Sequence, residues 1–172
     1  MGLFSKKAPK KNALSDGPKT NEEKRNELLQ KDPAAYVAIS FFTLADLFAK
    51  ENGAFTSPTG RIDFWAFLHW FSWDILEEAD PGNEVIGCFC DYLQAVRSYT
   101  ESDLEAAIDY LCEVGADLCT LYISPADTPL MIICGEAIQR LYGRRDPILS
   151  LSFAQYLARS AQIVCEAFPK NK

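Results

Sequence analysis

Apolar residues recur at steps of three and four along the chain after residue 32, and this spacing most restricts the possible folds. Such steps place side chains on one face of an α-helix, whereas a half-buried β-strand requires a step of two. No stretch of the sequence keeps a convincing step of two. The sequence therefore predicts an all-α fold.

Helix start and stop signals divide this pattern into six main helices. Several expected starts are an Asp or Thr followed by Pro, because the first residue can cap the helix and Pro fits its first turn. Gly and Asn-Gly signals mark several of the ends. The expected helices span about residues 33–50, 62–78, 83–98, 102–122, 129–143 and 147–168.

The fourth expected helix carries two local signals. Ser102 and Glu105 predict a capping box at its start. Gly115 lies in its interior, where glycine lowers helix stability by about 1 kcal/mol relative to alanine. If this helix bends or breaks, we expect it to do so at Gly115.

The six helices group into three consecutive helical hairpins. Pro33, Pro81 and Pro129 lie at equal intervals, and the interval is close to the length of a two-helix repeat. The three pairs share no residue signature, and their second helices begin at different offsets. A compact bundle is the simpler arrangement, with a short solenoid-like stack as the alternative. We expect one all-α domain over residues 32–169.

Charge is distributed unevenly along the chain. Residues 1–31 contain eight Lys and Arg against four Asp and Glu, whereas residues 32–172 contain nine against twenty, and the formal net charge is −7. The first 20 residues have few apolar groups to offset the entropy of ordering, so they predict a disordered basic tail. Residues 21–31 predict a short charged helix or linker, and residues 170–172 a disordered end. The acidic domain would repel phosphate backbones, so we expect no nucleic-acid binding through it.

The tail suggests weak peripheral contact with a membrane. It begins MGLFSKK, which resembles an N-myristoylation signal except that Lys6 stands where that signal has Ser or Thr. Lysines near an anionic lipid surface contribute about 1 kcal/mol each. A solubilising tail is the simpler interpretation. The candidate membrane-contact residues are Gly2, Leu3, Phe4, Lys6, Lys7, Lys10 and Lys11.

No segment predicts export or a membrane span. The N-terminus turns basic after four residues, without the apolar core of a signal peptide. The longest apolar stretch, residues 34–49, carries Asp46 and is expected to be too short to cross a bilayer. We therefore expect a cytoplasmic protein, in which the six cysteines stay reduced and act as small buried apolar residues.

The most distinctive feature is a row of carboxylates four residues apart on the fourth expected helix. No Lys or Arg occurs between Arg97 and Arg140, so no sequence neighbour neutralises it. The row is either a solvated face or a docking surface for a basic partner. Carboxylates along one helix diverge, which argues against a metal site. We name this set the acidic stripe, and its members are Glu101, Glu105, Asp109, Glu113 and Asp117.

The second expected helix is apolar around most of its girth and rich in aromatic residues. Such a helix is either central to the core, which is favoured here, or partly uncovered for a partner. Trp65, Trp70 and Trp73 have the composition of a binding hot spot and are candidate contact residues. His69 has no acidic residue three or four positions away, and we expect a buried histidine with one hydrogen bond.

Arg140, Arg144 and Arg145 cluster around Gly143, where a helix is expected to end. The first two arginines favour the negative end of a helix dipole, which is the simpler explanation of the cluster. The alternative is an anion site, because guanidinium groups bind carboxylate or phosphate well.

No motif predicts catalysis, a metal or a cofactor. The chain lacks the phosphate-loop, dinucleotide-binding, nucleophile-elbow and zinc-protease patterns. Cys88 and Cys90 are two residues apart, so on a helix they would face different directions and would not chelate zinc together.

The leading hypothesis is a non-enzymatic module that binds a basic protein through the acidic stripe, as an adaptor, chaperone, inhibitor or immunity-type neutraliser would. A peripheral membrane protein addressed by the basic tail is one alternative. A small enzyme using His69 or a cysteine with sequence-distant partners is another. The sequence makes no prediction about the oligomeric state.

Overall fold

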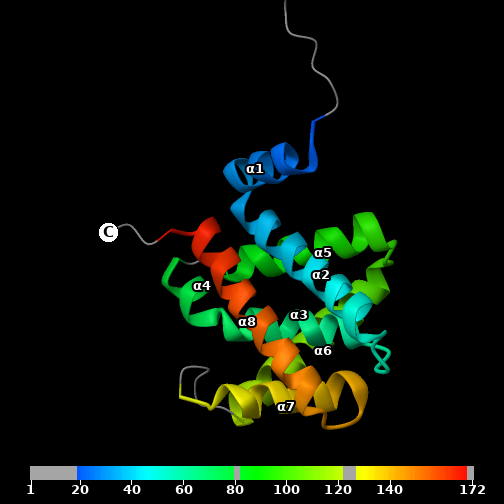
Figure 1. Ribbon diagram of the computed structural model, residues 1–172. Helices are drawn as coiled ribbons and strands as arrows, with labels where there is room; N and C mark the ends of the chain where they lie inside the picture. Colours follow the sequence, from blue (N-terminus) through cyan, green and yellow to red (C-terminus); the bar gives the residue numbers. More distant parts are fainter. Residues whose placement is uncertain (1–18, 80–81, 122–126, 170–172) are drawn as a thin grey trace, which may run out of the picture.

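The computed structural model describes residues 19–79, 82–121 and 127–169, and the regular structure within these ranges is helical (Figure 1). This confirms the all-α prediction. Of the predicted tail, only Lys19 and Thr20 are described, and Thr20 caps the first helix. The helices are α1 (Asn21–Lys31), α2 (Pro33–Asn52), α3 (Gly60–Phe71), α4 (Trp73–Ala79), α5 (Gly82–Arg97), α6 (Glu101–Leu121), α7 (Leu130–Tyr142) and α8 (Pro147–Ala167).

Local capping sets several of the helix boundaries. The Asp32 side chain accepts a hydrogen bond from the Ala35 amide at 2.9 Å, and Asp146 caps α8 in the same way. Both predicted starts are confirmed. Gly143 adopts a left-handed conformation (φ 69°) and ends α7, as its position in the sequence predicted.

Helix α6 begins at Glu101 and is capped by Thr100, two residues before the predicted cap Ser102. The Asp103 amide donates to Thr100 Oγ1 at 3.3 Å, while the Thr100 amide donates to the Asp103 carboxylate at 2.9 Å. The prediction of Ser102 and Glu105 was wrong, because Thr100 and Asp103 have the same spacing and form the box two residues earlier, after the turn at Ser98 (φ 57°). The helix then continues through Gly115 to Leu121, so no break occurs there.

The second predicted helix is divided at Ser72 into α3 and α4. The Ser72 amide donates to both Leu68 and His69 carbonyls, which tightens the last turn of α3. Its hydroxyl lies 3.3 Å from the hydroxyl of Ser160 on α8, with both side chains buried. The bend therefore coincides with a buried polar contact between helices distant in the sequence.

Helix α3 lies at the centre of the packing and contacts α2, α6, α7 and α8 (Figure 1). Helix α2 also packs against α5 and α8. Contact between α2 and α8 joins the first predicted hairpin to the third, which a serial stack of hairpins would not do. The arrangement is therefore the compact bundle.

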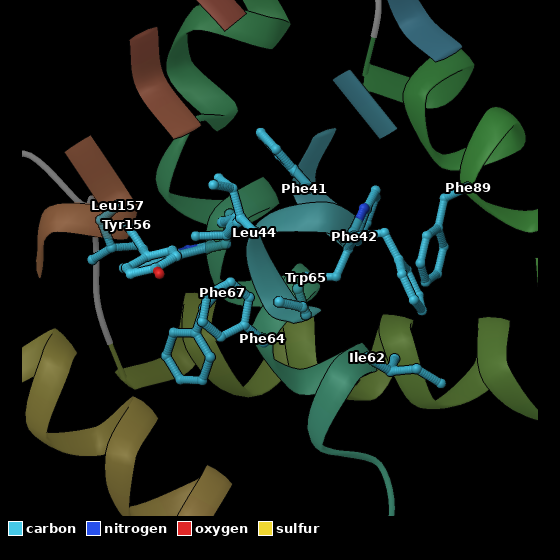
Figure 2. Close-up of a cluster of buried hydrophobic side chains, with 14 of the residues drawn as sticks. Phe41, Phe42, Leu44, Ile62, Phe64, Trp65, Phe67, Phe89, Tyr156 and Leu157 are labelled. Carbon is cyan, nitrogen blue, oxygen red and sulfur yellow. The ribbon is translucent and has the colours of Figure 1, made fainter. Parts of the chain in front are cut away.

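The core is built around aromatic side chains from α2, α3, α5 and α8 (Figure 2). Trp65 stacks on Phe89 with ring centroids 4.1 Å apart, meets the edge of Phe41, and donates its indole N–H to the Ala38 carbonyl. Phe48 lies at the centre of a second group of aromatic rings, and its ring centroid is 5.0 Å from that of Tyr156. These ring contacts fix the mutual orientation of four helices.

The expectation that the apolar stretch of α2 is too short to span a membrane was wrong. Its 20 residues are long and apolar enough by length and composition alone. Half of that apolar window is buried against the rest of the protein, where Phe41, Ala45 and Phe48 are fully enclosed. In this fold α2 is a core helix.

Two helix glycines should respond oppositely to alanine. A Cβ at Gly115 would meet no atom within 4 Å, so G115A should raise the free energy of unfolding by about 0.5–1 kcal/mol through helix propensity. A Cβ at Gly60 would lie 2.3 Å from Phe55 Cβ, so G60A should lower it by about 1–3 kcal/mol through overpacking. Urea unfolding followed by circular dichroism measures both, and a stabilised G60A variant would contradict this packing.

Candidate functional site

All five residues of the acidic stripe are exposed on α6. Asp117 pairs with Arg140 of α7 at 3.0 Å, so a cation distant in the sequence neutralises the last member of the stripe. The other four make no ion pair with any residue that the structure describes. The stripe is therefore an acidic surface without a paired cation from Glu101 to Glu113, whereas its last member, Asp117, is paired with Arg140.

A buried carboxylate lies beneath the paired end of the stripe. Asp63 of α3 is fully buried and accepts hydrogen bonds from Tyr110 at 2.8 Å, Thr59 at 2.9 Å and Ser57 at 3.2 Å. Arg140 Nε lies 3.6 Å from the Asp63 carboxylate. Because each carboxylate oxygen has a partner, the buried charge is satisfied by residues of α6, α7 and the loop before α3.

The titration of this cluster follows from its environment. Burial raises the pKa of Tyr110, so the phenol stays protonated and able to donate to Asp63. Burial alone would lower the pKa of Arg140, but its hydrogen bond to Asp117 and the neighbouring charges outweigh burial and raise it. Arg140 therefore stays charged and serves two carboxylates of this chain.

These contacts favour the simpler interpretation of the arginine cluster over an anion site. Arg140 is occupied by Asp63 and Asp117, and Arg144 lies 3.4 Å from Asp146. Of the three arginines, Arg145 alone has no ion pair among the described residues, and it is exposed. One arginine without a carboxylate partner is a weaker anion site than a patch of three.

The tryptophans are mainly core residues. Trp65 is fully buried and Trp70 is 8% exposed, so the interpretation of the helix as core is confirmed and neither offers an open contact surface. This removes Trp65 from the candidate contact residues. Trp73, at the start of α4, is half-buried. Trp70 and Trp73 instead form part of the wall of a cavity.

This cavity, which we name the His69 cavity, lies between α3, α4, α5 and α6 and has a volume of about 310 Å³. Trp70, Trp73, Ile86 and Leu111 supply apolar walls, and His69 lies among them. The imidazole stacks on Trp65 with ring centroids 5.0 Å apart and meets Trp73 at 5.4 Å. Sequence reasoning placed His69 in an apolar setting but had no way to find the space beside it.

His69 is neutral in the folded protein. Burial lowers its pKa to about 4, against a weaker opposing effect of a hydrogen bond to the Gly82 backbone. Its Nε2 is buried and has no hydrogen-bond partner among the described residues. The prediction of a buried histidine is therefore confirmed, and one ring nitrogen remains without a partner among the described residues.

The cysteines are all free, as predicted, but they are not all buried. Cys134 is buried, and burial raises its pKa to about 11. Cys112, Cys119 and Cys165 are exposed, and the first two line the His69 cavity. The expectation was wrong for these three because periodicity identifies an apolar face without showing whether another helix covers it.

Two signals for these features are present in the sequence, although no prediction was based on them. Asp63 is the one acid in the aromatic run of α3, and an acid in such a setting needs buried partners. Ile108, Cys112, Gly115 and Cys119 follow steps of four, three and four, so they share one face of α6. Ile108 is 39% exposed, and this face is the one that borders the cavity.

Among the described residues, no group of three or more His, Cys, Asp or Glu side chains is placed to hold a metal ion. The candidate membrane-contact residues of the tail lie outside the described part of the chain. Comparison with known proteins finds no matching family, no matching curated protein and no matching solved structure.

Removal of Arg140 should be far more costly than removal of Arg144. R140A leaves the buried Asp63 charge without its nearby cation, so the free energy of unfolding should fall by roughly 2–4 kcal/mol. R144A breaks only an exposed pair and should change it by less than about 0.5 kcal/mol. Urea unfolding of both variants checks this, and equal effects would show that Arg140 does not stabilise Asp63.

His69 should add a defined pH dependence to stability. Its ordinary pKa is 6.5 and its folded pKa is about 4, so in this window the unfolded chain binds a proton that the folded chain does not. The contribution of His69 to the free energy of unfolding is therefore fully present above pH 6.5. It falls by roughly 3 kcal/mol as the pH drops to about 4.

Urea unfolding of the wild type and the H69F variant at several pH values isolates this contribution, because the carboxylates are common to both proteins. The difference in the free energy of unfolding between the two should change across pH 4–6.5 and stay constant above it. Parallel curves would show that the folded protein accepts the proton without cost.

Proposed function

We propose that this protein is a non-enzymatic binding module whose α6 surface docks a basic protein. The observation that carries the proposal is the exposure of Glu101, Glu105, Asp109 and Glu113 without an ion pair to any described residue. Like charges four residues apart on a helix cost about 0.2–0.5 kcal/mol per pair at low salt. A basic surface placed against them would remove that repulsion and speed encounter.

The rigidity of α6 supports this function. The helix is continuous from Glu101 to Leu121, and its inner residues Leu111, Val114 and Leu118 are buried in the core. Tyr110 and Asp117 connect it through Asp63 and Arg140 to α3 and α7. The carboxylates are thus presented from a fixed support, which limits the entropy lost when a partner binds.

The enzymatic alternative is less well supported. Activation of a cysteine by histidine relies on an imidazolium that stabilises the thiolate. Burial lowers the pKa of His69 to about 4, so the ring is neutral at pH 7. The cavity that holds His69 and two thiols is therefore better suited to binding than to nucleophilic catalysis. The membrane alternative rests on tail residues that the structure does not describe.

Charge reversal on α6 tests the proposal. The intact protein and its D109K/E113K variant serve as baits for affinity capture, and each captured partner is then titrated at two salt concentrations. We expect a basic partner that binds more weakly at higher salt and whose affinity falls by about tenfold or more in the variant.

The matched control is E22K/E77K, which reverses two exposed carboxylates on α1 and α4 that are in no ion pair among the described residues. Each replacement adds two units of positive charge, so both double variants move the formal net charge from −7 to −3. Equal loss of binding in both would assign the effect to net charge. No loss in D109K/E113K would show that the stripe is only a solvated face.

A further inference from the structure

The His69 cavity opens to solvent along α6, so side chains of another molecule can enter it. Cys112 and Cys119 line the cavity and are exposed. The rest of its wall is mainly apolar, with Trp73 of α4 and Ile86 of α5 half-buried. Its volume of about 310 Å³ is at the lower end of the range for small-molecule sites, which is roughly 300–1,000 Å³. The cavity therefore suits a few apolar side chains of a partner better than a complete ligand.

The open edge of the cavity has the spacing of a helix-packing face. Residues of α6 recur there at steps of four, three and four, as they do in the apolar seam of a helix pair. We name this set the α6 seam, and its members are Ile108, Cys112, Gly115 and Cys119. The seam covers about three helical turns, or roughly 16 Å. Ile108 is 39% exposed, and a Cβ at Gly115 would meet no atom within 4 Å. Within the described part of the chain, the seam is thus largely uncovered.

The charge beside this seam selects the kind of partner. Asp74, on the α4 side, is the one charged residue among those that line the cavity. Glu105 and Asp109 each precede a residue of the α6 seam by three positions, so they lie beside it on the helix surface. Both are exposed and make no ion pair with any described residue. A partner helix with basic residues flanking an apolar face therefore matches the charge on both sides of the cavity.

The larger groove between α1, α2 and α8 does not select a partner in this way. Its volume is about 750 Å³, and its lining residues include Lys24, Arg25 and Arg159 as well as Glu166. Arg25 and Glu166 already pair with each other at 3.1 Å. Because both signs of charge are present and partly paired, the groove favours neither a basic nor an acidic partner.

We propose that the His69 cavity and the α6 seam together bind a basic amphipathic helix of a partner protein. The apolar face of that helix packs along the seam and projects side chains toward Trp73 and Ile86, while its basic residues lie against Glu105 and Asp109. A helix in an apolar groove is a common mode of recognition. This proposal rests on the proposed function, because it gives the basic partner a defined secondary structure and a second, apolar contact surface.

Two synthetic peptides of identical composition test the proposal on the intact protein. In the amphipathic peptide, leucines follow steps of three and four and lysines fill the other positions. In the reordered peptide, the same leucines are spread around the helix. Binding is measured by titration calorimetry and mapped by amide chemical shifts. We expect the amphipathic peptide to bind at least about tenfold more tightly, with shifts confined to α3, α4, α5 and α6 around the cavity.

Three variants separate the apolar contact from the charge. G115Q places a polar side chain in the α6 seam and should weaken the amphipathic peptide about tenfold without affecting the reordered one. Glutamine favours a helix more than glycine does, so this variant should fold. The matched control is G135Q, because Gly135 is a helical glycine of α7 whose Cβ would also meet no atom within 4 Å. It should bind both peptides as the wild type does, whereas E105K/D109K should weaken both.

Four results would overturn the proposal. If neither peptide binds, the helix has no site here, whereas affinity capture with D109K/E113K still decides the proposed function. Equal wild-type affinities for the two peptides, both weakened in E105K/D109K, would leave the acidic docking surface in place without a helix in the cavity. Undiminished binding of the amphipathic peptide by G115Q would place it outside the α6 seam. Self-association of the wild type that G115Q abolishes, measured by sedimentation equilibrium, would make a second copy of this chain the occupant. If G115Q does not fold, as judged by circular dichroism, the peptide pair and the shift map still decide the matter.

Discussion

The burial of α3 on every side is the constraint on which the rest of the structure depends. Every residue from Ile62 to Trp70 is buried, so neighbouring helices must cover the entire circumference of this stretch. Helices α2, α6, α7 and α8 do so, together with Phe89 of α5, which stacks on Trp65. One of the covered residues is Asp63, and a buried carboxylate is stable only with hydrogen bonds and a nearby cation. Its partners come from α6, α7 and the preceding loop, so a single charge helps to fix the position of three helices.

This arrangement also decides which charges on the surface remain available. Arg140 pairs with both Asp63 and Asp117, which shortens the unpaired part of the acidic stripe. The remaining carboxylates of α6 have no such neighbour. The inner face of α6 therefore belongs to the core while its outer face remains acidic, and this division is the basis of the proposed binding function.

The same packing leaves a space where α3 passes into α4. The bend at Ser72 and the close approach of Gly82 to Trp73 place two indole rings beside His69, and Gly115 of α6 leaves the opposite side open. The imidazole there is buried and neutral, which argues against acid–base chemistry at this position.

The sequence by itself determined the helical class and most helix boundaries, because spacing and capping are local. Asp32 and Asp146 cap the helices that they were expected to cap, and Gly143 ends α7. Only the tertiary structure decided which faces are covered. Tyr110 and Asp63 are 47 residues apart, and no local pattern pairs them. The exposure of Cys112 and Cys119 and the cavity beside His69 depend likewise on how α6 sits against α3, α4 and α5. Local hydrogen bonds fix where each helix begins and ends, whereas long-range burial fixes what each helix presents to solvent.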